Sequence, residues 1–332
     1  MPPDCEDEIT VSYLDDEGGV AQLREAINEV CDGGTIEILP GTLVLKRGQL
    51  VIPTDRWFTI TSSTQRASDV TIDGDDKSRV FLVEAGADVT ISHLTVTNGH
   101  PREGSASGLD YYGGGIRNLG TLNFNSGVIT NNHAGLRGGG ISNEGTVVVR
   151  ESVVSHNSSE ASPGAGIWSS GALTFVDSQI ISNRTENSCS GYGGGISSSG
   201  SANIVRSNID GNGAASGGGG FSNGGEMVIL GCTISDNYIG TFGGGGIRNH
   251  GTLTVTDTTV SGNRALNFRS GHGGGIENGG TLVVNGTSVI TDNRGTRGAG
   301  IYNYGSLDLR DSATISANTA TVHGGGIYNW DG

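Results

Sequence analysis

The sequence predicts an all-β chain: a single-stranded right-handed parallel β-helix (solenoid) with a short N-terminal capping α-helix. Glycine accounts for 60 of the 332 residues, far above the usual proportion of about 7%. A unit beginning Gly-Gly-Gly-Ile-x-Asn recurs along the chain, and its first isoleucines, Ile116, Ile141, Ile167 and Ile196, lie 25, 26 and 29 residues apart. Units of this length that cannot bury a core alone are typical of solenoids.

Each unit contains apolar positions spaced for three short strands. In the first unit Leu122 and Phe124 lie two residues apart, Ile129 follows, and Asn132 closes the unit. Alternate apolar residues indicate strands with one face inward. Stacked units would pair each strand in parallel with its equivalent in the next coil, and the crossover preference makes the coil right-handed.

Two columns of asparagine repeat with the units and predict side-chain ladders between coils. Ser169 and Ser198 interrupt the second column. The closing column contains Asn132, Asn157, Asn183, Asn212, Asn237, Asn263, Asn293 and Asn318, and the second contains Asn118, Asn143, Asn223, Asn249, Asn278, Asn303 and Asn329. A flexible glycine-rich linker would not keep such columns in register, and a propeller needs units of about 40–50 residues.

The N-terminal region predicts a cap for the solenoid. Leu23, Ala26, Ile27 and Val30 fall on one face of a helix over residues 20–31, and Asp32-Gly33-Gly34 should end it. We expect residues 1–34 to form a strand and this cap, 35–112 irregular coils, and 113–332 regular coils of one continuous domain. Because the sequence stops within a repeat, further coils are expected beyond it.

The cysteines suggest one disulfide. Cys5 and Cys31 flank the capping segment, so a bond between them would attach it to the first strand. Cys189 lies in a long loop and does not share a column with Cys232, so that pair is less favoured.

Every third unit carries a longer loop, at 99–112, 184–192 and 264–272. Duplication of a three-coil block explains this rhythm, and a ridge for partner contact is the functional alternative.

No catalytic residue and no metal site emerge from the spacing. Asp73-Gly74-Asp75-Asp76 is interpreted as a solvated turn, and His133 and His156 as surface residues on adjacent coils, out of register with each other. Asp177, Asp257 and Asp311 share a repeat position but lie two or three coils apart. We expect no cofactor; calcium is the alternative, and no motif indicates it.

The candidate ligand-binding residues are aromatic. Tyr302, Tyr304, Tyr328 and Trp330 occupy outward positions, with Tyr302 expected over Tyr328 and Tyr304 over Trp330. Such a ladder can stack on sugar rings or enter a protein interface, and simple packing of the last coils is the alternative. Arg248 and Glu277 share a column and predict a surface ion pair of small energetic value.

The segment Gln22-Leu23-Arg24-Glu25-Ala26-Ile27, followed by the Gly-Gly-Gly-Ile-x-Asn repeats, resembles the bacterial right-handed parallel β-helix proteins with a Ser-Leu-Arg-Glu-Ala segment. These are related in architecture to polymorphic outer-membrane adhesins and more distantly to pectate lyases, and Gln22 replaces the usual serine. The resemblance implies a secreted or cell-surface protein. The clustered carboxylates of pectate-lyase-like enzymes are not apparent.

Charge and hydropathy limit the partners. The net charge is −15, from 34 acidic and 19 basic residues, so nucleic-acid binding is not expected. No apolar run approaches the ~18 residues of a membrane-spanning helix.

The sequence favours a non-catalytic extracellular structural or adhesion module that binds a glycan or a protein of a host or neighbouring surface. The first alternative is a polysaccharide-acting enzyme of the pectate-lyase-like type, either a lyase or a hydrolase. The second is a surface filament subunit that associates end to end.

Overall fold

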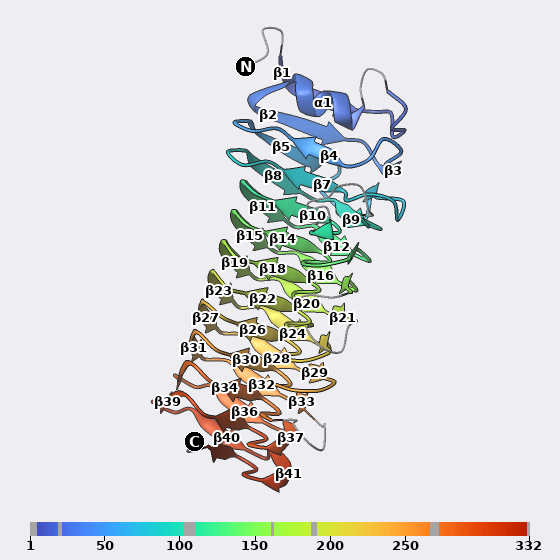
Figure 1. The fold of residues 1–332 in the computed structure, drawn as a ribbon. Coiled ribbons are helices and arrows are strands. Elements are labelled where there is room, and N and C mark those ends of the chain that lie inside the picture. Colours follow the sequence, from blue (N-terminus) through green and yellow to red (C-terminus); the bar gives the residue numbers. More distant parts are fainter. Residues whose placement is uncertain are drawn as a thin grey trace.

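The computed structural model describes residues 5–18, 22–101, 111–160, 163–186, 191–265 and 272–330. It confirms the predicted right-handed parallel β-helix: coils stack from the N-terminal cap to the last repeat, and four parallel sheets run along the stack (Figure 1). The single helix of the described part, α1 (Leu23–Glu29), lies at the N-terminal end.

Sheets A and C contribute most of the inward-facing apolar side chains of the core. Sheet A contains β1 (Glu6–Val11), β2 (Val30–Ile38), β5 (Trp57–Ser62), β8 (Asp88–Ser92), β11 (Thr121–Asn125), β15 (Thr146–Arg150), β19 (Ala172–Val176), β23 (Ser201–Val205), β27 (Glu226–Leu230), β31 (Thr252–Thr256), β35 (Thr281–Asn285) and β39 (Ser306–Leu309). Sheet C contains β4 (Leu50–Ile52), β7 (Phe81–Val83), β10 (Ile116–Asn118), β14 (Ile141–Asn143), β18 (Ile167–Ser169), β22 (Ile196–Ser198), β26 (Phe221–Asn223), β30 (Ile247–Asn249), β34 (Ile276–Asn278), β38 (Ile301–Asn303) and β42 (Ile327–Asn329).

Sheets B and D close each coil. Sheet B contains β3 (Gly41–Val44), β6 (Val70–Asp73), β9 (Thr95–Thr97), β12 (Val128–Thr130), β16 (Val153–Ser155), β20 (Gln179–Ile181), β24 (Asn208–Asp210), β28 (Thr233–Ser235), β32 (Thr259–Ser261), β36 (Val289–Thr291) and β40 (Thr314–Ser316). Sheet D contains β13 (His133–Ala134), β17 (Ser158–Ser159), β21 (Arg184–Thr185), β25 (Gly213–Ala214), β29 (Tyr238–Ile239), β33 (Arg264–Ala265), β37 (Arg294–Arg297) and β41 (Thr319–His323).

A regular coil therefore has four strands, and the prediction of three was incomplete. After the closing asparagine the chain stays extended for about two residues and pairs with the coils on either side. Ala214, Ile239 and Ala265 form a small separate buried cluster at this corner.

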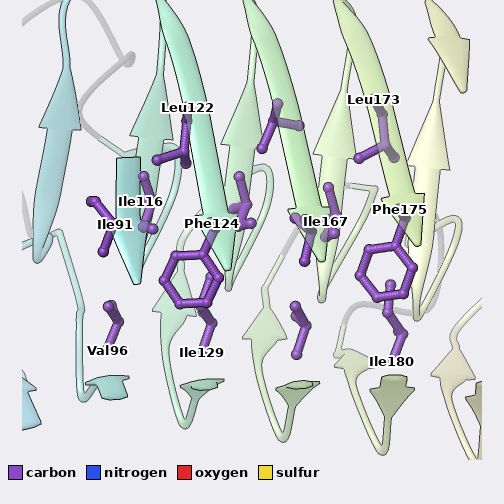
Figure 2. Packing of buried hydrophobic residues seen from close by; sticks show 14 of the residues in the cluster. Ile91, Val96, Ile116, Leu122, Phe124, Ile129, Ile167, Leu173, Phe175 and Ile180 are labelled. Atoms are coloured by element: carbon purple, nitrogen blue, oxygen red, sulfur yellow. The ribbon is translucent and has the colours of Figure 1, made fainter. Parts of the chain in front are cut away.

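The core is a set of aligned files, as the repeat predicts. Ile116 pairs in register with Ile141, which pairs with Ile167, which pairs with Ile196, and all four are buried. Phe124 and Phe175 lie in one further file (Figure 2). Each aliphatic side chain is thus covered by its counterparts in adjacent coils, and burying one contributes about 1.5–3 kcal/mol.

Both asparagine ladders are confirmed. In the closing ladder each side-chain Nδ2 donates to Oδ1 of the next asparagine at 2.9–3.0 Å, as from Asn183 to Asn212. The second ladder is likewise linked, and Ser169 accepts from Asn143 at 2.9 Å where it interrupts the column. These bonds satisfy polar groups at the corners of a narrow interior, where an unpaired group is costly.

The cap forms as predicted, but the helix ends earlier. Leu23, Ala26, Ile27 and Val30 are buried against the first coil. Residues 32–34, expected as a stop, belong to β2, because Val30 already has an extended backbone. Cys5 and Cys31 form the predicted disulfide. Within the described ranges, no helix is long and apolar enough to cross a membrane.

Candidate functional site

The outward side of sheet C presents three parallel columns of side chains, which we call the sheet C face. The middle column comes from the central residue of each three-residue strand, and the flanking columns come from the turns before and after it. The middle column contains Arg117, Ser142, Trp168, Ser197, Ser222, Arg248, Glu277, Tyr302 and Tyr328. The preceding column contains Tyr112, Arg137, Pro163, Tyr192, Gly217, Gly243, His272, Arg297 and His323. The following column contains Leu119, Glu144, Ser170, Ser199, Gly224, His250, Gly279, Tyr304 and Trp330.

The centre of this face is a buried carboxyl beside an arginine. Glu277 on β34 is 7% exposed, and its Oε2 lies 4.0 Å from Nε of Arg248 on the preceding coil. Neither atom has a hydrogen-bond partner among the described residues. The prediction that this ion pair lies at the surface was therefore wrong for Glu277, because neighbouring side chains cover the Glu277 carboxyl and keep it from bulk water.

Tyr304 and His250 complete what we call the Glu277 group: Arg248, His250, Glu277 and Tyr304. The Tyr304 hydroxyl donates to Glu277 Oε1 at 3.2 Å and lies 3.4 Å from His250 Nε2. Tyr304 reaches back over Gly279, where an added Cβ would overlap its ring. The absence of a side chain at Gly279 thus lets two residues two coils apart meet.

The surroundings shift the pKa values of these side chains. Burial raises the pKa of Glu277, an effect that Arg248 and the Tyr304 hydroxyl only partly oppose. Burial and the nearby Glu277 raise the pKa of Tyr304 to about 12. Burial and the charge of Arg248 lower the pKa of His250. At neutral pH the group therefore holds a neutral imidazole and a protonated phenol side by side.

The four aromatic residues predicted as a patch come together, with two differences. Tyr302 and Tyr328 stack as expected, with ring centroids 5.6 Å apart, and His272 stacks on the other side of Tyr302 at 4.3 Å. Tyr302 is only 2% exposed, because its neighbours cover it. Among the described residues, Trp330 makes its ring contact with Tyr302 rather than with Tyr304.

The other residues considered from the sequence have structural partners. Asp75 pairs with Lys77, and Asp76 lies 2.8 Å from His100 Nδ1. His133 is half-buried against Ser158, whereas His156 is exposed as expected.

The three aspartates that share a repeat position stabilise turns. Asp177, Asp257 and Asp311 all have positive φ. Asp177 pairs with Arg206, and the other two accept backbone N–H bonds from the adjacent coil. In the part of the chain that the structure describes, no three His, Cys, Asp or Glu side chains are placed to hold a metal.

The remaining predictions are tested only in part. Cys232 is a buried free thiol, and Cys189 lies outside the described residues. So do most of the residues of the three longer loops, and the proposed ridge is not described.

A hollow on the sheet D side is the other candidate site. Asp236, Tyr238, Ile239 and Arg264 line about 480 Å³ of open space. Its described lining contains one carboxylate, one guanidinium and an exposed ring, and none of these described side chains has a buried unpaired group like those of the Glu277 group. The sheet C face is therefore the stronger candidate.

Comparisons with known proteins define the class of fold. No protein-family model matches the chain, and no curated protein matches it in sequence. A solved pectate lyase, Pel9A, is 15% identical with a TM-score of 0.46, over 96% of this chain and 80% of that one. A PL6 alginate lyase, solved in complex with a trisaccharide, is 15% identical with a TM-score of 0.55, over 90% of this chain and 64% of that one.

The alginate lyase comparison and the coil geometry together show the pectate-lyase-like right-handed parallel β-helix fold. The chain spans about two thirds of that lyase's length, at 64%. At this identity the likeness concerns the fold alone, because one fold supports many activities.

Proposed function

We propose that this protein binds an acidic polysaccharide along the sheet C face and cleaves it by β-elimination at the Glu277 group. The observation that carries the proposal is the meeting of four side chains: the Tyr304 hydroxyl lies within hydrogen-bonding reach of the buried Glu277 carboxyl and of the neutral His250 imidazole, and Arg248 Nε lies 4.0 Å from Glu277 Oε2. An alginate lyase with the same fold, solved with a trisaccharide, supports polysaccharide as the substrate class.

Arg248 supplies recognition of a uronate carboxylate. Its Nε has no hydrogen-bond partner among the described residues, and its guanidinium carbon lies 4.9 Å from the centre of the Tyr192 ring, which supports one side of it. A planar guanidinium binds carboxylate through paired N–H groups. Exposed rings at the C-terminal end, including Trp330 at 56% exposure, offer apolar surfaces for sugar rings.

The proposed chemistry removes a proton and a leaving group from neighbouring carbons. Arg248 neutralises the substrate carboxylate, which acidifies the adjacent C–H, and neutral His250 accepts that proton. The C–H electron pair forms the double bond as the β carbon–oxygen bond breaks, and Tyr304 gives its proton to the departing glycosidic oxygen. The proton on His250 then passes to the Tyr304 oxygen across their 3.4 Å contact, which restores both groups.

Glu277 has a positioning role in this scheme. Its Oε1 accepts from the Tyr304 hydroxyl. The burial of Tyr304 itself, together with the charge and the hydrogen bond of Glu277, raises the pKa of Tyr304 and keeps the phenol protonated. A tyrosine held in this form is a proton donor rather than a base at neutral pH.

A non-catalytic glycan-binding module is the second candidate, and the stacked rings of His272, Tyr302 and Tyr328 favour it. Such a module would use the same face for binding alone. The Cys5–Cys31 disulfide supports an extracellular location for either function, because disulfides persist in oxidising compartments.

The test is the ultraviolet absorbance of the unsaturated uronate product, measured with alginate, polygalacturonate and a neutral glucan. We expect absorbance to rise with at least one acidic polymer, to stay flat with the glucan, and to fall by about 100-fold or more in His250→Ala, the size of a general-base contribution. Arg206→Gln, which removes an exposed arginine two coils earlier and away from the sheet C face, is the matched control for Arg248→Gln. Binding without any product would overturn elimination in favour of the binding module.

A further inference from the structure

A second arginine on the sheet C face lies against two aromatic rings. The guanidinium carbon of Arg137 lies 4.6 Å from the centre of the Trp168 ring and 5.3 Å from that of Tyr112. The two rings are 6.2 Å apart and tilted. We call Tyr112, Arg137 and Trp168 the Arg137 group. Both rings lie within cation–π distance of the guanidinium, and because the two centroids are closer to each other than the sum of these distances, the rings flank it from neighbouring directions and leave its remaining side for a ligand.

Arg137 has no carboxylate partner among the described residues, although an arginine beside it does. Arg117, also near Tyr112 at 5.6 Å, donates from Nε and Nη2 to Glu144 Oε1 at 3.1 and 2.9 Å. That carboxylate is thus engaged by Arg117. In a chain of net charge −15, the Arg137 guanidinium thus contacts two rings and, among the described residues, no carboxylate.

The group is built on a rigid support. Arg79 is 3% exposed, and its Nε donates to the carbonyl oxygens of both Tyr112 and Gly113 at 3.0 Å. The carbonyl of Arg137 accepts from Gly113 N–H at 2.8 Å. Trp168 is 7% exposed beneath the guanidinium. The ring positions are therefore set by buried contacts, which lowers the entropic cost of binding.

The same device recurs at the Glu277 group. Tyr112 and Tyr192 occupy the same position in the repeat, 80 residues apart, each directly before the glycine turn. Tyr192 contacts Arg248, which lies two coils later in the middle column, and Tyr112 contacts Arg137, which lies one coil later in the preceding column. Four coil steps separate the two arginines, from the coil of Ile141 to that of Ile247, which is about 19 Å at a spacing of about 4.8 Å.

We infer that Arg137 is a second carboxylate-binding subsite, which holds an acidic polysaccharide chain extending along the sheet C face from the Glu277 group. This inference rests on the proposed function, since the chain is the substrate named there. It adds a length requirement: a chain long enough to span both arginines gains an interaction that a trisaccharide bound at the Glu277 group does not.

The experiment compares Arg137→Gln with wild type on polymeric alginate or polygalacturonate and on the trisaccharide of the same sugar. We expect the variant to bind and cleave the polymer about tenfold less well, the loss of one charge-assisted hydrogen bond, with the trisaccharide unchanged. Arg150→Gln, which removes an exposed arginine on sheet A, is the control for lost charge. Far-ultraviolet circular dichroism of Arg137→Gln should match that of wild type, which would show that the variant is folded.

The outcomes separate the two proposals. If wild type cleaves the polymer and Arg137→Gln equals Arg150→Gln on both substrates, the subsite is refuted and the proposed function stands. An equal loss on polymer and trisaccharide also refutes it, because the arginine would then act on the whole fold. If wild type neither binds nor cleaves any acidic polymer, the proposed function fails, and this inference fails with it.

Discussion

The closing asparagine ladder permits a quantitative prediction for Asn212→Ala. The Asn212 side chain takes part in four buried hydrogen bonds: it accepts from the backbone N–H and the Nδ2 of Asn183, and it donates to Ile180 O and to Asn237 Oδ1. The substitution leaves the Asn183 N–H buried without that partner, at a cost of about 1–3 kcal/mol. Loss of the other three bonds adds about 0.5–1 kcal/mol each, so we expect the free energy of unfolding to fall by about 2.5–6 kcal/mol.

Urea unfolding followed by circular dichroism measures this change. Asn203→Ala is the matched control, because Asn203 is an exposed residue of β23 on sheet A, where substitutions usually change stability by no more than about 0.5 kcal/mol. The denaturation midpoint should fall for Asn212→Ala with an unchanged slope and stay in place for Asn203→Ala. Equal midpoints for the two variants would refute the reasoning that buried ladder bonds hold the coils in register.

Three further predictions concern the cap, the glycine beneath Tyr304, and pH. Cys5→Ser should lower the unfolding free energy by about 3 kcal/mol, as expected for a loop of this length. Reductant should lower the thermal midpoint of wild type but not that of Cys5→Ser, and an equal effect of reductant on both proteins would contradict this prediction. Gly279→Ala should displace Tyr304 and lower cleavage. Gly224→Ala, in the same column, should not, because only Ser198 O lies within 4 Å of its new Cβ, at 3.7 Å. Equal cleavage by the two variants would contradict the proposed geometry. Because the pKa of Tyr304 is raised from 10.0 to about 12 in the folded chain, folded protein retains a proton that unfolded protein loses, and stability should fall as pH rises through this interval. Tyr304→Phe should show a shallower fall, and identical pH profiles of thermal unfolding for the two proteins would contradict the shift.

The sequence predicted the coils well because their determinants are local and repeated. Alternate apolar residues such as Leu122 and Phe124 can face only one interior, and the next unit places its own pair in register above them. Sheet D was missed because its strands are mostly two residues long. Pairs such as Ser158–Ser159 and Gly213–Ala214 carry no apolar alternation that would reveal a strand.

The candidate site was predicted only in part because it depends on side-chain directions. The shared column of Arg248 and Glu277 was visible in the sequence, but the burial of Glu277 follows from how Tyr304 lies. His250, Gly279 and Tyr304 occupy one column. Aligning that column would have shown that Gly279, between the other two, has no side chain to block the Tyr304 ring. The Arg137 group needed the further knowledge that Tyr112 turns toward Trp168.

Product analysis in heavy-oxygen water tests the central claim most directly. Elimination at the Glu277 group predicts that fragments of the acidic polysaccharide carry an unsaturated end and no oxygen from solvent, as mass spectrometry would show. Fragments that each contain one solvent oxygen would instead indicate hydrolysis and contradict the roles given to Arg248, His250 and Tyr304.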